Sequence, residues 1–164
     1  MAEKWRDEGT CDERIDDYLK SRLKAIRKLV KYEEGRAAYD PEYGSLSEFG
    51  VAVDYVPAET FPGQKYGYFR WQIGVGGPQD EFRFLTQNPR DHWPEIEYWF
   101  LDWNDGACRE MKAQRKKLLQ SVWQYFQEIC AIEAASAGHV WEAGDFRRKR
   151  QQDLDDHGYD PYLG

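Results

Sequence analysis

The sequence predicts an α+β fold, with an N-terminal helix, a four-stranded antiparallel sheet, a long helix packed on the sheet and a polar C-terminal tail. Apolar residues recur every three or four positions near the start of the chain and again after residue 107, as in helices with one buried side. Between these regions lie four short predicted strands, of which three alternate apolar and polar residues and the fourth, EIEYWFLDW, is the most apolar. We expect one domain over residues 1–144 and a tail over residues 145–164, part of which has the composition of a short helix.

The first helix is predicted to begin after Thr10 and to end at Gly35, because Thr10 and Glu13 have the spacing of a capping box and glycine ends helices. Its apolar side is formed by Ile15, Tyr18, Leu19, Leu23, Ile26, Leu29 and Val30. Its other side carries Lys20, Arg22, Lys24, Arg27, Lys28 and Lys31. We interpret this basic side as a solvated face rather than a nucleic-acid site, since charge runs along one helix face usually contact water.

The four predicted strands lie in the segments VAVDYV, KYGYFRWQIGVG, DEFRFL and EIEYWFLDW. In the second segment the alternation separates Phe69, Trp71, Ile73 and Val75 from Tyr68, Arg70 and Gln72. In the third, Phe82 and Phe84 are expected to face the core, while Glu81 and Arg83 point outward. The connections are short and contain Gly and Pro, so the strands are predicted to form an antiparallel meander.

A second helix is predicted from Ala107 to Ala137, with Gly138 as its stop. Its apolar side would comprise Cys108, Met111, Leu118, Leu119, Val122, Phe126, Ile129 and Cys130. We expect this helix to cover the sheet, and we expect the Cys108 and Cys130 thiols to be buried and inert.

The charge and the cysteine content limit the classes of partner and the compartment. The formal net charge is -7, from 30 acidic and 23 basic residues, which disfavours non-specific attachment to nucleic acid or to an anionic membrane and favours a basic partner. Three cysteines without CxxC spacing indicate free thiols in a reducing compartment. With no apolar run of signal-peptide length, the expected location is the cytoplasm of a host cell.

No pattern in the sequence predicts a catalytic, metal or cofactor site. His92, His139 and His157 lie in a turn, after a helix stop and in the tail, so no nucleophile has an obvious base. The acids between residues 80 and 105 match neither an EF-hand nor a zinc spacing. The segment GVGGP lacks the features of a P-loop. The RRKR run at residues 147–150 contains enough charge to grip phosphates, but a solvated helix face is the simpler interpretation.

The stretch from Gly76 to Gly106 mixes acids with aromatic rings, and two interpretations of it remain open. The rings are core and the acids are solubilising, or the two together form a flat, charged surface for a protein partner. The predicted partner-binding residues are Asp80, Glu81, Glu95, Glu97, Tyr98, Trp99, Asp102 and Asp105. On the second interpretation Glu81 and Glu97 are exposed, and their reversal to lysine is expected to leave folding intact.

The segments GGPQDEFRF and IEYWFLDWNDGA resemble small acidic accessory proteins of phages and conjugative elements, over roughly Tyr66 to Ala107. This resemblance implies a non-enzymatic inhibitor of host defence, of the anti-CRISPR or antirestriction type. Such inhibitors present acidic surfaces to nucleic-acid-binding sites. We therefore predict that the protein binds a protein effector through its acidic and aromatic surface, without direct contact with nucleic acid, and blocks the effector's nucleic-acid site or its assembly. The 23 basic residues favour the blocking of one basic site over mimicry of a whole duplex.

The alternative prediction is a small nucleic-acid-binding regulatory protein of a mobile element. It would use the basic side of the first helix and the RRKR run, and its binding would weaken steeply with salt.

Overall fold

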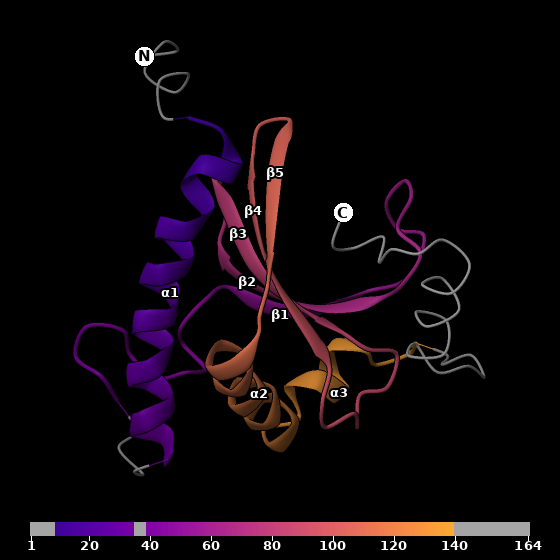
Figure 1. Cartoon of the computed structure of the whole chain (residues 1–164). Coiled ribbons are helices and arrows are strands. Elements are labelled where there is room, and N and C mark those ends of the chain that lie inside the picture. The colour runs from indigo at the N-terminus through magenta and orange to yellow at the C-terminus, as the bar shows by residue number, and fades with distance from the viewer. Residues whose placement is uncertain (1–8, 35–38, 140–164) are drawn as a thin grey trace.

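The computed structural model describes residues 9–34 and 39–139 and confirms the α+β class (Figure 1). The described elements are α1 (Cys11–Glu34), β1 (Ala52–Val56), β2 (Tyr68–Gly74), β3 (Gln79–Leu85), β4 (Glu95–Asp102), β5 (Asp105–Glu110), α2 (Ala113–Glu128) and α3 (Ala131–Ala135). The sheet has five strands, one more than predicted. The expected tail at residues 145–164, with its RRKR run, lies outside the described residues.

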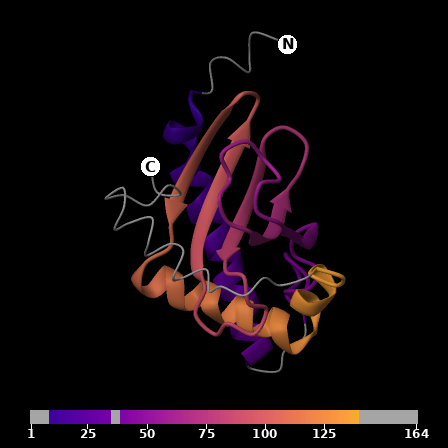
Figure 2. The same ribbon diagram turned by 90° about the vertical axis from the view of Figure 1, so that its right-hand side faces the viewer.

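The sheet is the predicted antiparallel meander, because its strands lie side by side in the order in which the chain forms them. Figure 2 shows the strands in front and α1 behind them. In this register Phe82 of β3 lies opposite Trp71 of β2 and Tyr98 of β4. The centroid of the Phe82 ring is 5.7 Å from that of the Trp71 ring and 4.9 Å from that of the Tyr98 ring. A row of aromatic rings therefore crosses the sheet face that the helices cover.

The first helix has the predicted start and the predicted apolar side. The Glu13 backbone N–H donates to the Thr10 hydroxyl oxygen at 3.2 Å, as in a capping box. The predicted stripe is buried apart from Tyr18, which is half-buried with its ring 4.5 Å from that of Phe100. Neither α1 nor any other described helix is both long and apolar enough to cross a membrane.

The second helix covers the part of the same sheet face that α1 leaves open. The Trp123 ring lies 5.3 Å from Phe69 and 5.1 Å from Phe84, and Phe126 lies 5.2 Å from Trp71. The indole N–H of Trp123 donates to the Asp91 carbonyl at 2.6 Å, so this buried ring also has its polar group satisfied. The two helices and the sheet therefore enclose one aromatic core.

The prediction of a helix from Ala107 is wrong, because residues 105–110 form strand β5. Asp105 pairs with Asp102 across a turn of two residues, Trp103 and Asn104. The pairing continues beyond the strand, since the Met111 backbone N–H donates to the Ile96 carbonyl at 2.8 Å. Pairing with the open edge of β4 gives the backbone N–H and C=O groups of residues 105–110 hydrogen-bond partners. This stabilisation outweighs the weak helical spacing of apolar residues in the segment.

The predicted helix is also interrupted near its end. Cys130 adopts φ 62°, in the left-handed region, and separates α2 from the short α3. Cys130 is exposed and not buried as predicted, and Val75 lies exposed beyond the end of β2. Cys130 continues the apolar period of α2, and Val75 continues the alternation of β2, but each residue lies beyond the end of its element.

We expect Trp71→Ala to lower the free energy of unfolding by about 3–5 kcal/mol, because it removes a large side chain from the middle of the ring row. Trp71 is only 2% exposed and contacts rings from β3 and α2. Urea denaturation followed by circular dichroism measures the change. A loss below about 1 kcal/mol would contradict the described packing.

Candidate functional site

The structure divides the eight predicted partner-binding residues among three places. Two lie on the sheet face under the helices, four on the opposite face, and two at the end of the sheet beside the start of α1. These groups are Asp80 and Tyr98, then Glu81, Glu95, Glu97 and Trp99, then Asp102 and Asp105. The prediction of one exposed acidic and aromatic face is wrong for Asp80, Glu81, Glu97 and Tyr98, which are buried.

Under the helices, the buried Asp80 forms an ion pair with Arg22 of α1, whose side chain is partly exposed. The two carboxylate oxygens accept from the guanidinium at 2.8 and 3.0 Å, and the Tyr98 hydroxyl donates to the same carboxylate at 2.7 Å. Burial, together with the Asp80 charge, raises the pKa of Tyr98 well above its usual value, so the phenol stays a donor. Gly74 makes room for the pair, since a β-carbon there would lie 2.5 Å from the Asp80 Oδ1.

The inward position of Asp80 was available from the sequence. Asp80 has the same parity along β3 as Phe82 and Phe84, which were correctly predicted to face the core. A carboxylate on that side requires a cation from the covering helix, and Arg22 is the residue that supplies it. This group therefore fixes a helix on the sheet and is not available to a partner.

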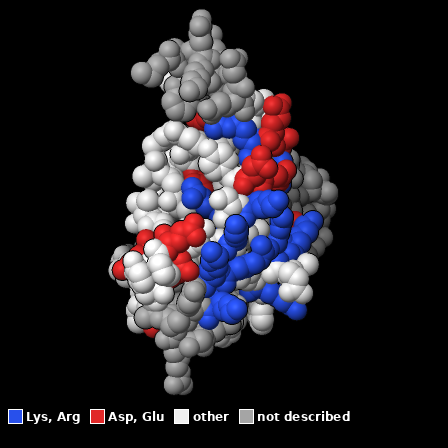
Figure 3. Space-filling model, turned by 90° about the vertical axis from the view of Figure 1, so that its left-hand side faces the viewer, with Lys and Arg blue, Asp and Glu red and all other residues white. Residues whose placement is uncertain are grey.

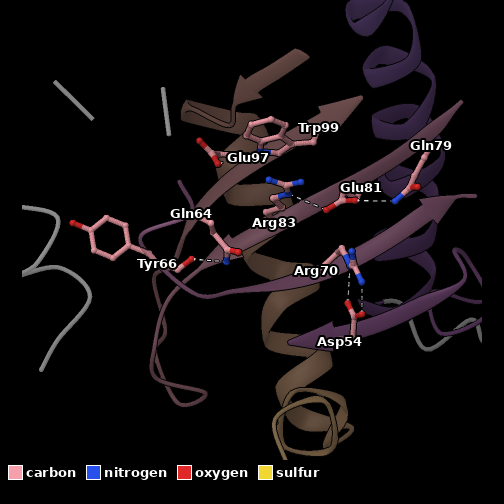
Figure 4. Close-up of polar contacts among 9 residues, drawn as sticks. All are labelled: Asp54, Gln64, Tyr66, Arg70, Gln79, Glu81, Arg83, Glu97 and Trp99. Atoms are coloured by element: carbon pink, nitrogen blue, oxygen red, sulfur yellow. Dashed lines mark hydrogen bonds and ion pairs between the residues drawn. The ribbon is translucent and has the colours of Figure 1, made fainter. Parts of the chain in front are cut away.

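On the opposite face, Arg83 lies beside Glu81 and Trp99 (Figure 4), and its guanidinium also lies over the Tyr68 ring. The guanidinium carbon is 4.0 Å from the centroid of the Trp99 ring and 4.5 Å from that of Tyr68. Its Nε donates to Glu81 at 2.8 Å, and the Gln79 amide donates to the same carboxylate at 3.3 Å. Glu81 points outward as predicted, but it is buried and neutralised where it lies.

The other carboxylates of this face are paired in a similar way. Glu97 accepts from the Trp99 indole at 3.2 Å, and Glu95 binds Lys116 of α2 at 3.1 Å. Asp54 of β1 accepts two hydrogen bonds from Arg70, at 2.9 and 2.6 Å. The face therefore carries paired carboxylates in place of an exposed acidic field, while the buried Tyr68 hydroxyl beside Arg83 forms no hydrogen bond within the described residues.

At the end of the sheet, the turn between β4 and β5 is anchored to α1. Asp105 accepts from the Cys11 backbone N–H at 2.8 Å and from the Gly106 backbone N–H at 2.9 Å. The Cys11 hydrogen bond at the helix start, followed by that of Gly106, lowers the pKa of Asp105. Asp102 binds Arg14 at 2.7 Å, so both predicted residues hold this turn in place.

Between these two aspartates, the Trp103 side chain is 86% exposed. The sequence does not predict Trp103 as a site residue, because the expected fourth strand, EIEYWFLDW, includes it and ends only at the Asn104-Asp105-Gly106 turn. Further carboxylates stand on the adjacent turns of α1, where Asp12 and Asp16 bind Arg109 at 2.9 and 3.1 Å. Glu13 and Asp17 on the same turns are exposed. We call Trp103 and these carboxylates the acidic tip: Asp12, Glu13, Asp16, Asp17, Asp102, Trp103 and Asp105.

Within residues 9–34 and 39–139, no three His, Cys, Asp or Glu side chains are grouped so that they would hold a metal ion. The Cys108 thiol lies in β5, and burial, followed by the Glu97 charge, raises its pKa to about 12. A thiol with this pKa is protonated at neutral pH and is a poor nucleophile.

Comparison with protein-family models, with curated proteins and with solved structures found no match for the chain. Function is therefore inferred from the chemistry of its surface.

Glu81→Lys is expected to cost about 3–5 kcal/mol of unfolding free energy, because it replaces the buried partner of Arg83 by a second cation. Glu128→Lys is the matched control, since Glu128 is exposed at the end of α2 and its reversal should stay within about 0.5 kcal/mol. Urea denaturation of both variants tests the burial of Glu81. Equal unfolding free energies for the two variants would contradict the burial of Glu81 and would favour the exposed position that the sequence predicts.

Alkylation should distinguish Cys108 from Cys130. Three pKa units above its usual value of 9.0, the Cys108 thiol has about a thousandfold less thiolate at mildly alkaline pH. Iodoacetamide on the native protein, followed by peptide mass mapping, should label the exposed Cys130 and leave Cys108 unmodified until denaturant is added. Native labelling of Cys108 at the rate of Cys130 would show that β5 opens.

Proposed function

We propose that the protein is a non-enzymatic inhibitor that binds a basic, nucleic-acid-binding surface of another protein through the acidic tip. The observation that carries this proposal is the exposure of Trp103 among carboxylates. Tryptophan is among the side chains that most often dominate the energy of protein interfaces. Removal of about 150–250 Å² of ring surface from water would contribute roughly 4–6 kcal/mol before the costs of association.

The tip is organised in advance of binding. Cys11 and Arg14 of α1 hold Asp105 and Asp102 on either side of the two-residue turn. A partner would therefore not need to order a loop around Trp103, and this lowers the entropic cost of association.

The charge of the tip selects the class of partner. Figure 3 shows acidic side chains gathered over the N-terminal turns of α1. Among the described residues, two arginines, Arg14 and Arg109, form ion pairs with the six carboxylates of the tip. Uncompensated negative charge speeds encounter with a basic surface, and a desolvated indole slows release. Nucleic-acid-binding sites of proteins are basic surfaces of this kind.

The resemblance to accessory proteins of phages and conjugative elements supports an effector of host defence, of the CRISPR type, as the target in the host cytoplasm. The segment that carries the resemblance, IEYWFLDWNDGA, ends in the tip. The acidic tip is one compact surface. It is therefore better suited to block a single basic site than to mimic a whole duplex.

Trp103→Ala should weaken partner binding about thirtyfold or more, which corresponds to a hot spot of at least 2 kcal/mol. Folding should be unchanged, because Trp103 has φ 53° and alanine carries the same β-carbon into that conformation. The control is Trp93→Ala, which removes a second exposed indole, 57% accessible, from the loop at the other end of β4. Thermal melting of all three proteins checks that only binding differs.

The partner is sought by affinity capture from a host lysate with the parent, Trp103→Ala and Trp93→Ala proteins in parallel. A protein retained by the parent and by Trp93→Ala, but not by Trp103→Ala, is then tested for release of its nucleic acid when the parent is added. Equal capture by all three proteins, or capture without displacement of nucleic acid, would contradict the proposal.

A further inference from the structure

Residues 20–31 of α1 and the start of α2 form a continuous basic surface. Figure 3 shows Lys and Arg side chains gathered over these two helices, below the acidic turns of α1. Its members are Lys20, Lys24, Arg27, Lys28 and Lys31 of α1, with Lys112, Arg115, Lys116 and Lys117 at α2. We call this set the basic surface. Arg22 does not belong to it, because it turns inward to Asp80.

The basic surface is largely uncompensated. Neither α1 between residues 18 and 32 nor α2 between residues 113 and 127 contains an acidic residue. Lys28, Lys112 and Lys116 have carboxylate partners at 3.6, 3.3 and 3.1 Å. The other six form no ion pair with a carboxylate among the described residues. The chain contains more acidic than basic residues, with a net charge of -7, yet most of these cations have no acidic neighbour. Their mutual repulsion therefore does not serve the stability of the fold.

We propose that the basic surface binds the phosphate backbone of duplex nucleic acid. Lys20 and Lys31 are eleven residues apart on one helix, or about 16 Å. About five phosphates of one DNA strand occupy that axial length, at 3.4 Å each. The cations of α2 provide a second row for the same backbone or the facing one. Two rigid helices thus present point charges that neutralise phosphates.

A duplex fits this surface better than a single strand does. Proteins that hold single strands stack the bases on exposed aromatic rings. The described aromatic side chains of α1 and α2 are buried or half-buried: Tyr18, Trp123, Tyr125 and Phe126. Among the rings outside these helices, Tyr43 lies beneath the Lys28 ammonium, 5.5 Å from it. Contacts with phosphate alone carry no base sequence, so the binding should be non-specific.

This inference goes beyond the proposed inhibition and does not depend on it. The acidic tip and the basic surface occupy successive parts of α1, residues 12–17 and residues 20–31, and so are distinct sets of side chains.

The test is fluorescence anisotropy of the full chain with a labelled duplex of about 20 base pairs, at about 50 and 200 mM salt. We expect binding at the lower salt concentration that weakens about a thousandfold at the higher one, as for six phosphate contacts. The variant with Lys20→Ala, Lys24→Ala, Arg27→Ala and Lys31→Ala should lower the salt slope by three to four, since each cation contributes about one. Arg115→Ala with Lys117→Ala should lower it by about two.

Lys65→Ala is the matched control, because Lys65 is exposed in the loop between β1 and β2, away from both helices. Circular dichroism confirms that each variant is folded. Absence of duplex binding by the parent at low salt, or equal binding by the fourfold variant and Lys65→Ala, would overturn the proposal. Preferential binding of polyglutamate over the duplex would also overturn it, in favour of an acidic protein. Trp103→Ala should bind the duplex as the parent does, which separates this result from failure of the acidic tip.

Discussion

The buried pair between Arg22 and Asp80 determines how α1 lies on the sheet, and both charged surfaces follow from that placement. The Asp80 carboxylate accepts three hydrogen bonds, two from Arg22 and one from Tyr98. A shift of α1 by one turn would leave a buried carboxylate without its cation, which costs about 3–5 kcal/mol. With Arg22 fixed, the helix start must lie beside the β4–β5 turn, where Cys11 binds Asp105.

The distribution of charge along α1 agrees with the helix dipole. Its first turns are acidic, and its later turns are basic until the final residues. The dipole favours the acids of the first turns, and it favours Lys31 in the last turn, but it does not favour Glu33 and Glu34 at the end of the helix. The same arrangement gives the molecule two surfaces of opposite sign. A chain with net charge -7 can therefore have a strongly positive face, and its net charge alone does not identify its partners.

The sequence was sufficient for the elements with a clear period and insufficient where distant pairing decides the structure. Alternation correctly predicted β1 to β3 and the inward side of Phe82, and an apolar run between two turns correctly predicted β4. By contrast, β5 has neither pattern and forms because the edge of β4 is open. Alternation also gives the direction of Glu81 but not its burial, which depends on Arg83 and its neighbouring rings. Arg22 and Asp80 are 58 residues apart, so no local pattern indicates that they meet.

Trp103 differs from the other rings of the acidic and aromatic stretch in a way that bears on function. A ring within a strand finds neighbours on both adjoining strands, as Phe82 does, but a residue in a two-residue turn has no such neighbours. Trp103 also adopts φ 53°, a conformation that costs a residue with a β-carbon about 1–2 kcal/mol and that suits glycine or asparagine better. Neither the strain nor the exposed indole is offset by packing within the described chain. A large ring held in a strained turn, without packing against the described residues, is the feature that the proposed contact with another molecule would explain.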